Sequence, residues 1–131
     1  MDDRRVIVLD TSALLFWTLD PGNLSRKAAQ AIGQADRVLV SSISIWEIAL
    51  KVKRQVLEIP LPVNEYASRL QHLEKLEILP VDAQNWLANL ELSWGRRDPA
   101  DRTIVALARQ FDCPLVSSDP LIADFYPGTI W

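Results

Sequence analysis

The sequence predicts an α/β protein whose central, mainly parallel sheet is covered by helices on both faces. Short apolar runs rich in β-branched residues alternate along the chain with longer segments of helical period. Strands that alternate with helices favour right-handed crossovers, and therefore parallel strands that are buried on both faces. The length of 131 residues suits one domain spanning residues 1–131.

Four apolar runs are predicted to form buried strands. They are "VIVL" (6–9), "RVLVS" (37–41), "LEILPV" (76–81) and "PLVSS" (114–118). Helical patterns are expected near 23–34, 43–54, 63–74, 83–93 and 99–111. Ligands of such sheets bind beyond the carboxyl ends of the strands, so side chains at that edge are candidates for a functional site.

Most of these helical segments begin at a residue that can cap a helix. The candidates are Asn23 or Ser25, Ser42 or Ser44, Asn64 after Pro62, Asp82, and Asp98 before Pro99.

Composition and charge exclude several classes of function. No apolar run approaches the roughly 18 residues that a membrane-spanning helix needs. The net charge of −3 argues against nucleic-acid binding driven by the overall charge of the protein. It is compatible with a nuclease whose acids are neutralised by metal. The opening "MDDRRVIVLD" differs from a secretory signal, and the lone cysteine, Cys113, has no partner for an internal disulfide. We therefore expect a cytoplasmic protein.

Acidic residues gather at the predicted carboxyl edge of the sheet. Asp10 and Asp119 end strands, and Glu47 lies in the helix that follows the second strand. Asp98 and Asp101 open a later helix, whose direction is less certain because it follows another helix. Helix capping would explain Asp10, Asp98 and Asp119, and an i,i+4 pair with Lys51 would explain Glu47.

Asp101 is harder to explain by local structure. It shares helical spacing with Ile104, Val105 and Ala108, which places it on the apolar face. An ionised carboxylate there needs a partner, and several converging acids either raise a pKa or recruit a metal. Because the candidate ligands are oxygens and the only histidine, His72, lies in a charged stretch, Mg²⁺ or Mn²⁺ fits better than zinc.

The motifs "VIVLDTSALLFW", "SSISIWEIALKVK", "RRDPADRTIVALA" and "PLVSSDPLIADFYPGTIW" follow one another in this order. Together they resemble the PIN-domain ribonucleases of the VapC toxin type, over essentially the whole chain. The resemblance implies a PIN-like three-layer sandwich and a Mg²⁺- or Mn²⁺-dependent endoribonuclease that hydrolyses RNA phosphodiester bonds. It also implies a toxin that forms homodimers and binds a cognate antitoxin.

Carried over to this sequence, the resemblance makes Asp10, Glu47, Asp101 and Asp119 the catalytic, metal-binding acids, with Asp98 as an accessory ligand. It implies that the substrate is contacted by Thr11, Ser12, Arg96, Arg97, Arg102 and Ser118, because hydroxyl groups and guanidinium forks suit phosphate. A solvated arginine, or an internal ion pair for Arg102, is an equally good interpretation. Many relatives carry histidine just before the "RDP" motif, where this sequence has Arg96 and Arg97.

Two other interpretations compete with an active nuclease. A receiver-like domain would need an acidic pair directly after the first strand and a lysine after the last, whereas Asp2 and Asp3 precede the first strand and no lysine follows Lys75. A non-catalytic PIN-like module that binds RNA or protein would be expected to lack some of the acids. The five tryptophans are expected to fill the core or to lie at interfaces.

Overall fold

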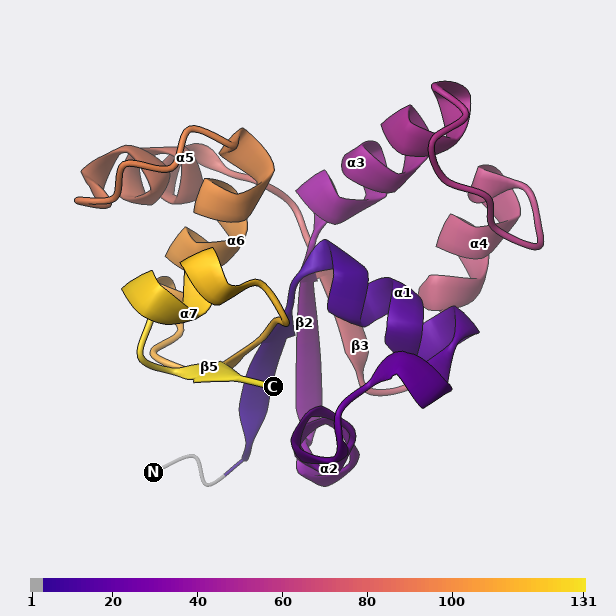
Figure 1. The fold of residues 1–131 in the computed structure, drawn as a ribbon, viewed down its shortest axis with the longest axis horizontal. Helices are drawn as coiled ribbons and strands as arrows, with labels where there is room; N and C mark the ends of the chain where they lie inside the picture. The colour runs from indigo at the N-terminus through magenta and orange to yellow at the C-terminus, as the bar shows by residue number, and fades with distance from the viewer. Residues whose placement is uncertain (1–3) are drawn as a thin grey trace.

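A wholly parallel five-stranded sheet forms the centre of the structure, a computed structural model that describes residues 4–131 (Figure 1). Its strands are β1 (Val6–Leu9), β2 (Arg37–Ser41), β3 (Leu76–Leu79), β4 (Leu115–Val116) and β5 (Thr129–Ile130). They lie in the order β3-β2-β1-β4-β5, so β1 is central. Asp2 and Asp3, which bear on the receiver-like alternative, lie outside the described residues.

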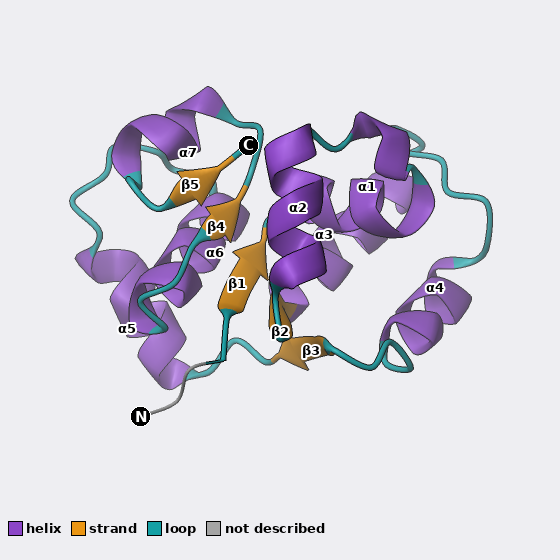
Figure 2. Cartoon of the chain, turned by 90° about the horizontal axis from the view of Figure 1, so that it is seen from below, coloured by secondary structure: helices purple, strands orange, loops and turns teal. Residues whose placement is uncertain are grey.

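Helices cover both faces of this sheet, which gives three layers (Figure 2). They are α1 (Thr11–Leu19), α2 (Arg26–Gln34), α3 (Ser42–Lys53), α4 (Val63–Leu70), α5 (Ala83–Glu91), α6 (Pro99–Gln110) and α7 (Pro120–Phe125), with a short 3₁₀ turn, η1, at Pro21–Asn23. None of the helices in the described part of the chain is long and apolar enough to cross a membrane.

Alternating strand residues feed two apolar cores. Ile7 and Val38 pack in the core on one face, together with residues of α1, α2, α3 and α4. Val8, Leu39 and Leu115, which are aligned by the strand register, pack on the other face against residues of α6 and α7. This division follows from the period of two along a strand, which sends successive side chains to opposite faces.

The predicted α/β fold is confirmed, with differences where the sequence signal is weak. All four predicted strands are present, but β3 is only partly buried because it is an edge strand. The fifth strand, β5, and the helices α1 and α7 are additional to the predicted elements.

The observed helix caps agree with the predicted ones in three of the five cases. Ser25, Asp82 and Asp98 accept hydrogen bonds from the first turns of α2, α5 and α6. The cap of α3 is Ser41 rather than Ser42 or Ser44, because β2 runs directly into the helix. The N-cap of α4 is Pro62, which has no side chain that could cap, and Asn64 lies inside the helix.

The tryptophans divide between the cores and the surface. Trp17, Trp94 and Trp131 are partly buried against the cores, and Trp94 stacks on Phe125 with ring centroids 4.8 Å apart. Trp46 and Trp86 are instead exposed, by 57% and 46% of their surfaces.

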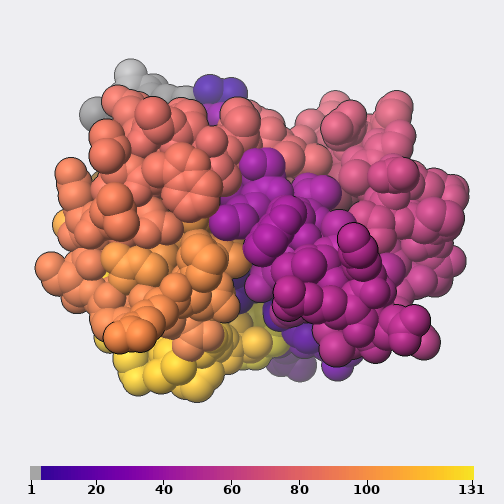
Figure 3. Space-filling view, turned by 90° about the horizontal axis from the view of Figure 1, so that it is seen from above, coloured from indigo at the N-terminus to yellow at the C-terminus, as the bar shows by residue number. Residues whose placement is uncertain are grey.

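The connections place four helix N-termini near one edge of the sheet. β1, β2 and β4 lead into α1, α3 and α7, whose N-termini therefore lie at the carboxyl edge. The sequence left the direction of α6 uncertain. In the structure α6 leads into the parallel strand β4, so it runs antiparallel to the strands and its N-terminus lies at their carboxyl edge. Seen from above, α3 lies at the middle of the surface, with α5, α6 and α7 on one side of it and α4 on the other (Figure 3).

Candidate active site

Asp10 is the most buried acid at the carboxyl edge of the sheet. It follows β1 and caps α1, where its Oδ1 accepts a hydrogen bond of 2.8 Å from the N–H of Ala13. Only 7% of its surface is exposed. Burial, with the charges of Asp101 and Asp119, raises the pKa of Asp10 to about 6, while the Ser117 hydroxyl and the Ala13 N–H lower it. An added cation near Asp10 would relieve this unfavourable burial of charge.

Asp101 lies in the first turn of α6 and turns toward the same edge. Burial and the neighbouring charge of Asp98 raise its pKa, Arg96 opposes them, and Glu47 adds a further repulsive charge. Asp98 is the N-cap of α6: its Oδ1 accepts from the N–H groups of Ala100 at 2.9 Å and Asp101 at 3.2 Å. Asp98 therefore stabilises the helix start that positions Asp101.

Asp119 caps the short helix α7 after β4. Its Oδ1 accepts from the N–H of Leu121 at 2.9 Å, and its own N–H donates to the Oγ of Ser117 at 3.1 Å. Ser117 is buried and its hydroxyl also acts on Asp10, so it links the two acids. The sequence prediction named the neighbouring Ser118, which is exposed, and did not identify Ser117.

The helices α1 and α3 also contribute polar side chains to this edge: Glu47, Thr11 and Ser44. Glu47 lies in the second turn of α3, with 17% of its side chain exposed and Lys51 at 3.7 Å. The Thr11 and Ser44 hydroxyl groups are buried and lie 2.8 Å apart. Thr11 was predicted as a substrate contact and Ser44 as a helix cap, whereas the structure pairs them with each other. Ser12 is exposed.

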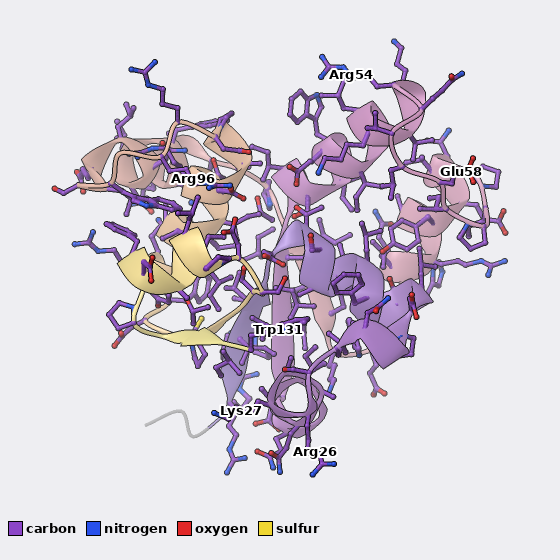
Figure 4. All side chains as sticks on the ribbon, in the orientation of Figure 1. Arg26, Lys27, Arg54, Glu58, Arg96 and Trp131 are labelled. Carbon is purple, nitrogen blue, oxygen red and sulfur yellow. The ribbon has the colours of Figure 1, made fainter. Side chains whose placement is uncertain are left out.

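Arg96, which is labelled in Figure 4, brings a positive charge into the acidic cluster. Its Nε donates to Oδ2 of Asp101 at 2.5 Å, and its Nη2 lies 3.2 Å from Oδ2 of Asp119. The side chain is 25% exposed. Arg97, the next residue, is exposed and forms no hydrogen bond or ion pair with any residue of 4–131.

Arg102 has a different role from the predicted phosphate contact. Its guanidinium donates to the Oδ1 and the carbonyl of Asn89, at 3.2 and 2.6 Å. It also donates to the carbonyls of Leu92, Trp94 and Arg96, at 3.1, 2.6 and 3.1 Å. Because these acceptors occupy its donors, Arg102 closes the end of α5 and fixes the loop that carries Arg96, and it is neither an internal ion pair nor open to a phosphate.

The donor chemistry of the edge fits a hard divalent cation. Asp10 is buried and Asp101 half-buried, the pKa of each carboxyl group is raised, and Mg²⁺ and Mn²⁺ prefer carboxylate oxygens. As the side chains lie, however, no group of three or more histidine, cysteine, aspartate or glutamate residues within 4–131 is arranged to hold an ion. Two of the carboxylates contact Arg96 instead. The assignment of these residues as metal ligands stays a prediction.

Comparison with known proteins agrees with the fold. The family model described as PIN domain matches residues 7–126. The chain is 31% identical over 129 residues to Ribonuclease VapC22 of Mycobacterium tuberculosis (strain ATCC 25618 / H37Rv), covering 95% of this chain and 98% of that protein. It is thus an α/β protein with carboxylates gathered at the carboxyl edge of a parallel sheet, and it belongs to the PIN-domain family.

Solved structures with low sequence identity share this fold. A toxin-antitoxin complex from Klebsiella pneumoniae contains a chain that matches with a TM-score of 0.65 and 18% identity, over 95% of this chain and 96% of that one. The sarcin-ricin loop cleaving toxin VapC20 of Mycobacterium tuberculosis matches with a TM-score of 0.63 and 16% identity, over 90% of this chain and 93% of that one.

The raised pKa of Asp10 predicts a pH-dependent stability in metal-free protein. The folded state binds the Asp10 proton more tightly than the unfolded state, whose pKa is near 3.8, so ionisation of Asp10 destabilises the fold as pH rises from 4 toward 7. Asp10→Asn removes this loss and keeps an oxygen that can cap α1. Its free energy of unfolding relative to wild type should therefore rise by about 2 kcal/mol between pH 4 and pH 7, measured by urea denaturation in EDTA.

Asp124→Asn is the matched control for this measurement, because Asp124 is exposed on α7. Its difference from wild type should not change with pH. A difference between Asp10→Asn and wild type that is equally flat would contradict the raised pKa of Asp10.

Proposed function

We propose that this chain is an endoribonuclease that hydrolyses RNA phosphodiester bonds and acts as the toxin of a type II toxin–antitoxin pair. The observation that carries the proposal is the convergence of Asp10, Asp101 and Asp119, with Arg96 among them, in a PIN-domain chain that resembles Ribonuclease VapC22. The proposal takes residues 1–131 as a single PIN domain and places the protein in the cytoplasm.

The proposed cofactor is Mg²⁺ or Mn²⁺, held by Asp10, Glu47, Asp101 and Asp119, with Asp98 as an accessory ligand. When bound, such an ion lowers the pKa of a bound water and offsets negative charge on a phosphate. The protein supplies no histidine for acid–base chemistry at this edge: His72, the one histidine of the sequence, is exposed, and its Nδ1 lies 2.8 Å from the Ser68 carbonyl. The carboxylates must therefore provide the chemistry together with the ion.

The proposed substrate contacts are the groups at this edge that retain free donors. Arg97 is exposed and unpaired within 4–131, and the hydroxyl groups of Ser12 and Ser118 lie on the surface next to Asp10 and Asp119. Arg96 joins them when it leaves its carboxylate partners, whereas Arg102 is not included because its donors are occupied. A positively charged rim of this kind attracts phosphates to an otherwise acidic site.

The alternative of a non-catalytic module that binds RNA or protein is less well supported. Such a module has no need to bury carboxylates whose charges repel one another, since this arrangement costs stability. Here Asp10 and Asp101 are kept at that cost.

The two acids of the "DPAD" segment should differ in what they contribute. Asp101→Asn should abolish RNA cleavage, because it removes a proposed metal ligand. It should cost little stability, because burial and the charge of Asp98 raise the pKa of Asp101 and so disfavour its ionised form. Asp98→Asn, which keeps an oxygen that can cap α6, should lower the melting temperature slightly and reduce cleavage less. Both are measured on a mixed cellular RNA pool with Mg²⁺, with Mn²⁺ and with EDTA, alongside thermal denaturation.

Asp124→Asn is again the matched control, and it should cleave and melt like wild type. Discrete fragments that vanish in EDTA and with Asp101→Asn support the proposed nuclease. Equal loss of cleavage in Asp98→Asn and Asp101→Asn, with unchanged melting, would refute the division of labour between them.

A cognate antitoxin is the proposed protein partner. The Klebsiella pneumoniae structure that this chain resembles is a toxin-antitoxin complex. In this chain a hollow of about 700 Å³ lies between α1 and α4, and its walls are mainly apolar or aromatic: Trp17, Leu61, Tyr66, Leu70 and Leu73. A hollow of this size and chemistry fits apolar side chains of a partner segment.

A homodimer is the second proposed assembly, and exposed apolar side chains on α3 and α5 support it. Trp46 and Trp86 line one hollow of about 340 Å³ together with Pro99, and Leu87 and Leu90 of α5 are 60% and 77% exposed. Exposed tryptophan and leucine side chains of this kind are costly in water and typical of protein interfaces.

Trp86→Glu should therefore convert a dimer to a monomer, because it places a charge at the centre of this surface. Light scattering coupled to size-exclusion chromatography measures the mass directly. Val56→Glu is the control, since Val56 is 71% exposed but lies outside this surface, and it should remain dimeric. A monomeric wild-type protein, or a dimer that survives Trp86→Glu, would contradict the proposed interface.

A further inference from the structure

The guanidinium of Arg96 lies between two proposed metal ligands. Its Nε is 2.5 Å from Oδ2 of Asp101 and its Nη2 is 3.2 Å from Oδ2 of Asp119. Asp101 comes from α6 and Asp119 from the start of α7, so one side chain joins two elements that approach the edge from different parts of the sequence. The arginine thus neutralises charge where the acids would otherwise repel one another.

The backbone that carries Arg96 is held in place independently of this ion pair. Arg102 binds the carbonyls of Leu92, Trp94 and Arg96 itself. Asp98, two residues further on, caps α6. A change at this position must therefore come from rotation of the Arg96 side chain, which is partly exposed.

A divalent ion that binds Oδ2 of Asp101 and Oδ2 of Asp119 competes with Arg96 for these oxygens and adds a second positive charge beside the guanidinium. Mg²⁺ binds oxygen at about 2.1 Å, closer than any donor nitrogen approaches. Within 4–131 no set of three acidic, histidine or cysteine side chains is ready to hold an ion while Arg96 is in place. Because arginine stays protonated at physiological pH, loss of a proton cannot release the pair.

We infer that Arg96 is a built-in counter-ion of the acidic site, which a divalent ion must displace from Asp101 and Asp119 in order to bind. This inference rests on the proposed metal-dependent function. The displaced guanidinium remains next to the acids. There it can bind a phosphate of the RNA, which is negatively charged like the carboxylates that Arg96 has left. Arg96 is then a positioning residue that couples metal entry to substrate contact.

The test is the affinity of the purified protein for Mn²⁺, measured by isothermal titration calorimetry without RNA. Arg96→Gln removes the competing charge, so it should bind Mn²⁺ about ten-fold more tightly than wild type, which corresponds to about 1.4 kcal/mol. Arg97→Gln is the matched control, because Arg97 carries the same charge one residue away but contacts neither carboxylate. Its Mn²⁺ affinity should stay within about two-fold of wild type.

Thermal denaturation supplies a second readout. It distinguishes replacement of Arg96 by a metal ion from a purely structural role of Arg96. In EDTA, Arg96→Gln should melt below wild type and Arg97→Gln, because the acids lose their partner. Saturating Mn²⁺ should restore its melting temperature to the wild-type value. A loss of melting temperature that persists in Mn²⁺, or an affinity of Arg96→Gln equal to or weaker than that of wild type, would overturn the inference.

Two further results distinguish this inference from the proposed function. Equal Mn²⁺ affinity in all three proteins would overturn the role of Arg96 and leave a metal-dependent nuclease standing, whereas folded proteins that all fail to bind Mn²⁺ would overturn both. Should Arg96→Gln not fold, Arg96→Lys keeps the charge but lacks the two-pronged fork. It should bind Mn²⁺ more tightly than wild type, and unchanged or weaker binding would overturn the inference.

Discussion

Repulsion among carboxylates gathered at one edge of a parallel sheet is the constraint on which the rest of this structure depends. The central strand β1 and its neighbour β4 each deliver an aspartate there, and α6 and α3 bring Asp101 and Glu47 to the same place. Burial strengthens the repulsion, as the raised pKa of Asp10 indicates. A cation is needed to hold this arrangement, and in the described chain the Arg96 guanidinium supplies it.

Helix capping and site chemistry are combined in the same side chains rather than being alternatives. In both Asp10 and Asp119, Oδ1 accepts from a backbone N–H of the helix that follows. In Asp119 the other oxygen, Oδ2, contacts Arg96. One oxygen thus fixes the carboxylate and the second is available to a cation, which gives a rigid ligand at little entropic cost. In Asp98, Oδ1 accepts from two backbone N–H groups of the first turn of α6, and this contact positions Asp101.

The sequence predicted those features that depend on local pattern. Buried strands such as β1 and β2 have clear apolar runs, and the acids that follow strands can be placed because parallel strands end at one edge. The two-residue strand β5 has no periodic signal. The contacts of Ser117, Arg96 and Arg102 depend on how distant segments meet. Residue type and spacing could therefore suggest positive charge near the acids. They could not show that Arg102 binds carbonyls and Arg96 binds carboxylates.

The most direct test of the account is the anomalous diffraction of crystals grown with Mn²⁺, because it locates the ion and the Arg96 side chain in one experiment. The account predicts a manganese peak among the carboxylates of Asp10, Asp101 and Asp119, with the guanidinium turned away from Asp101 and Asp119. Crystals in saturating Mn²⁺ that show no manganese at these carboxylates, or that keep Arg96 between the two aspartates beside a bound ion, would contradict it.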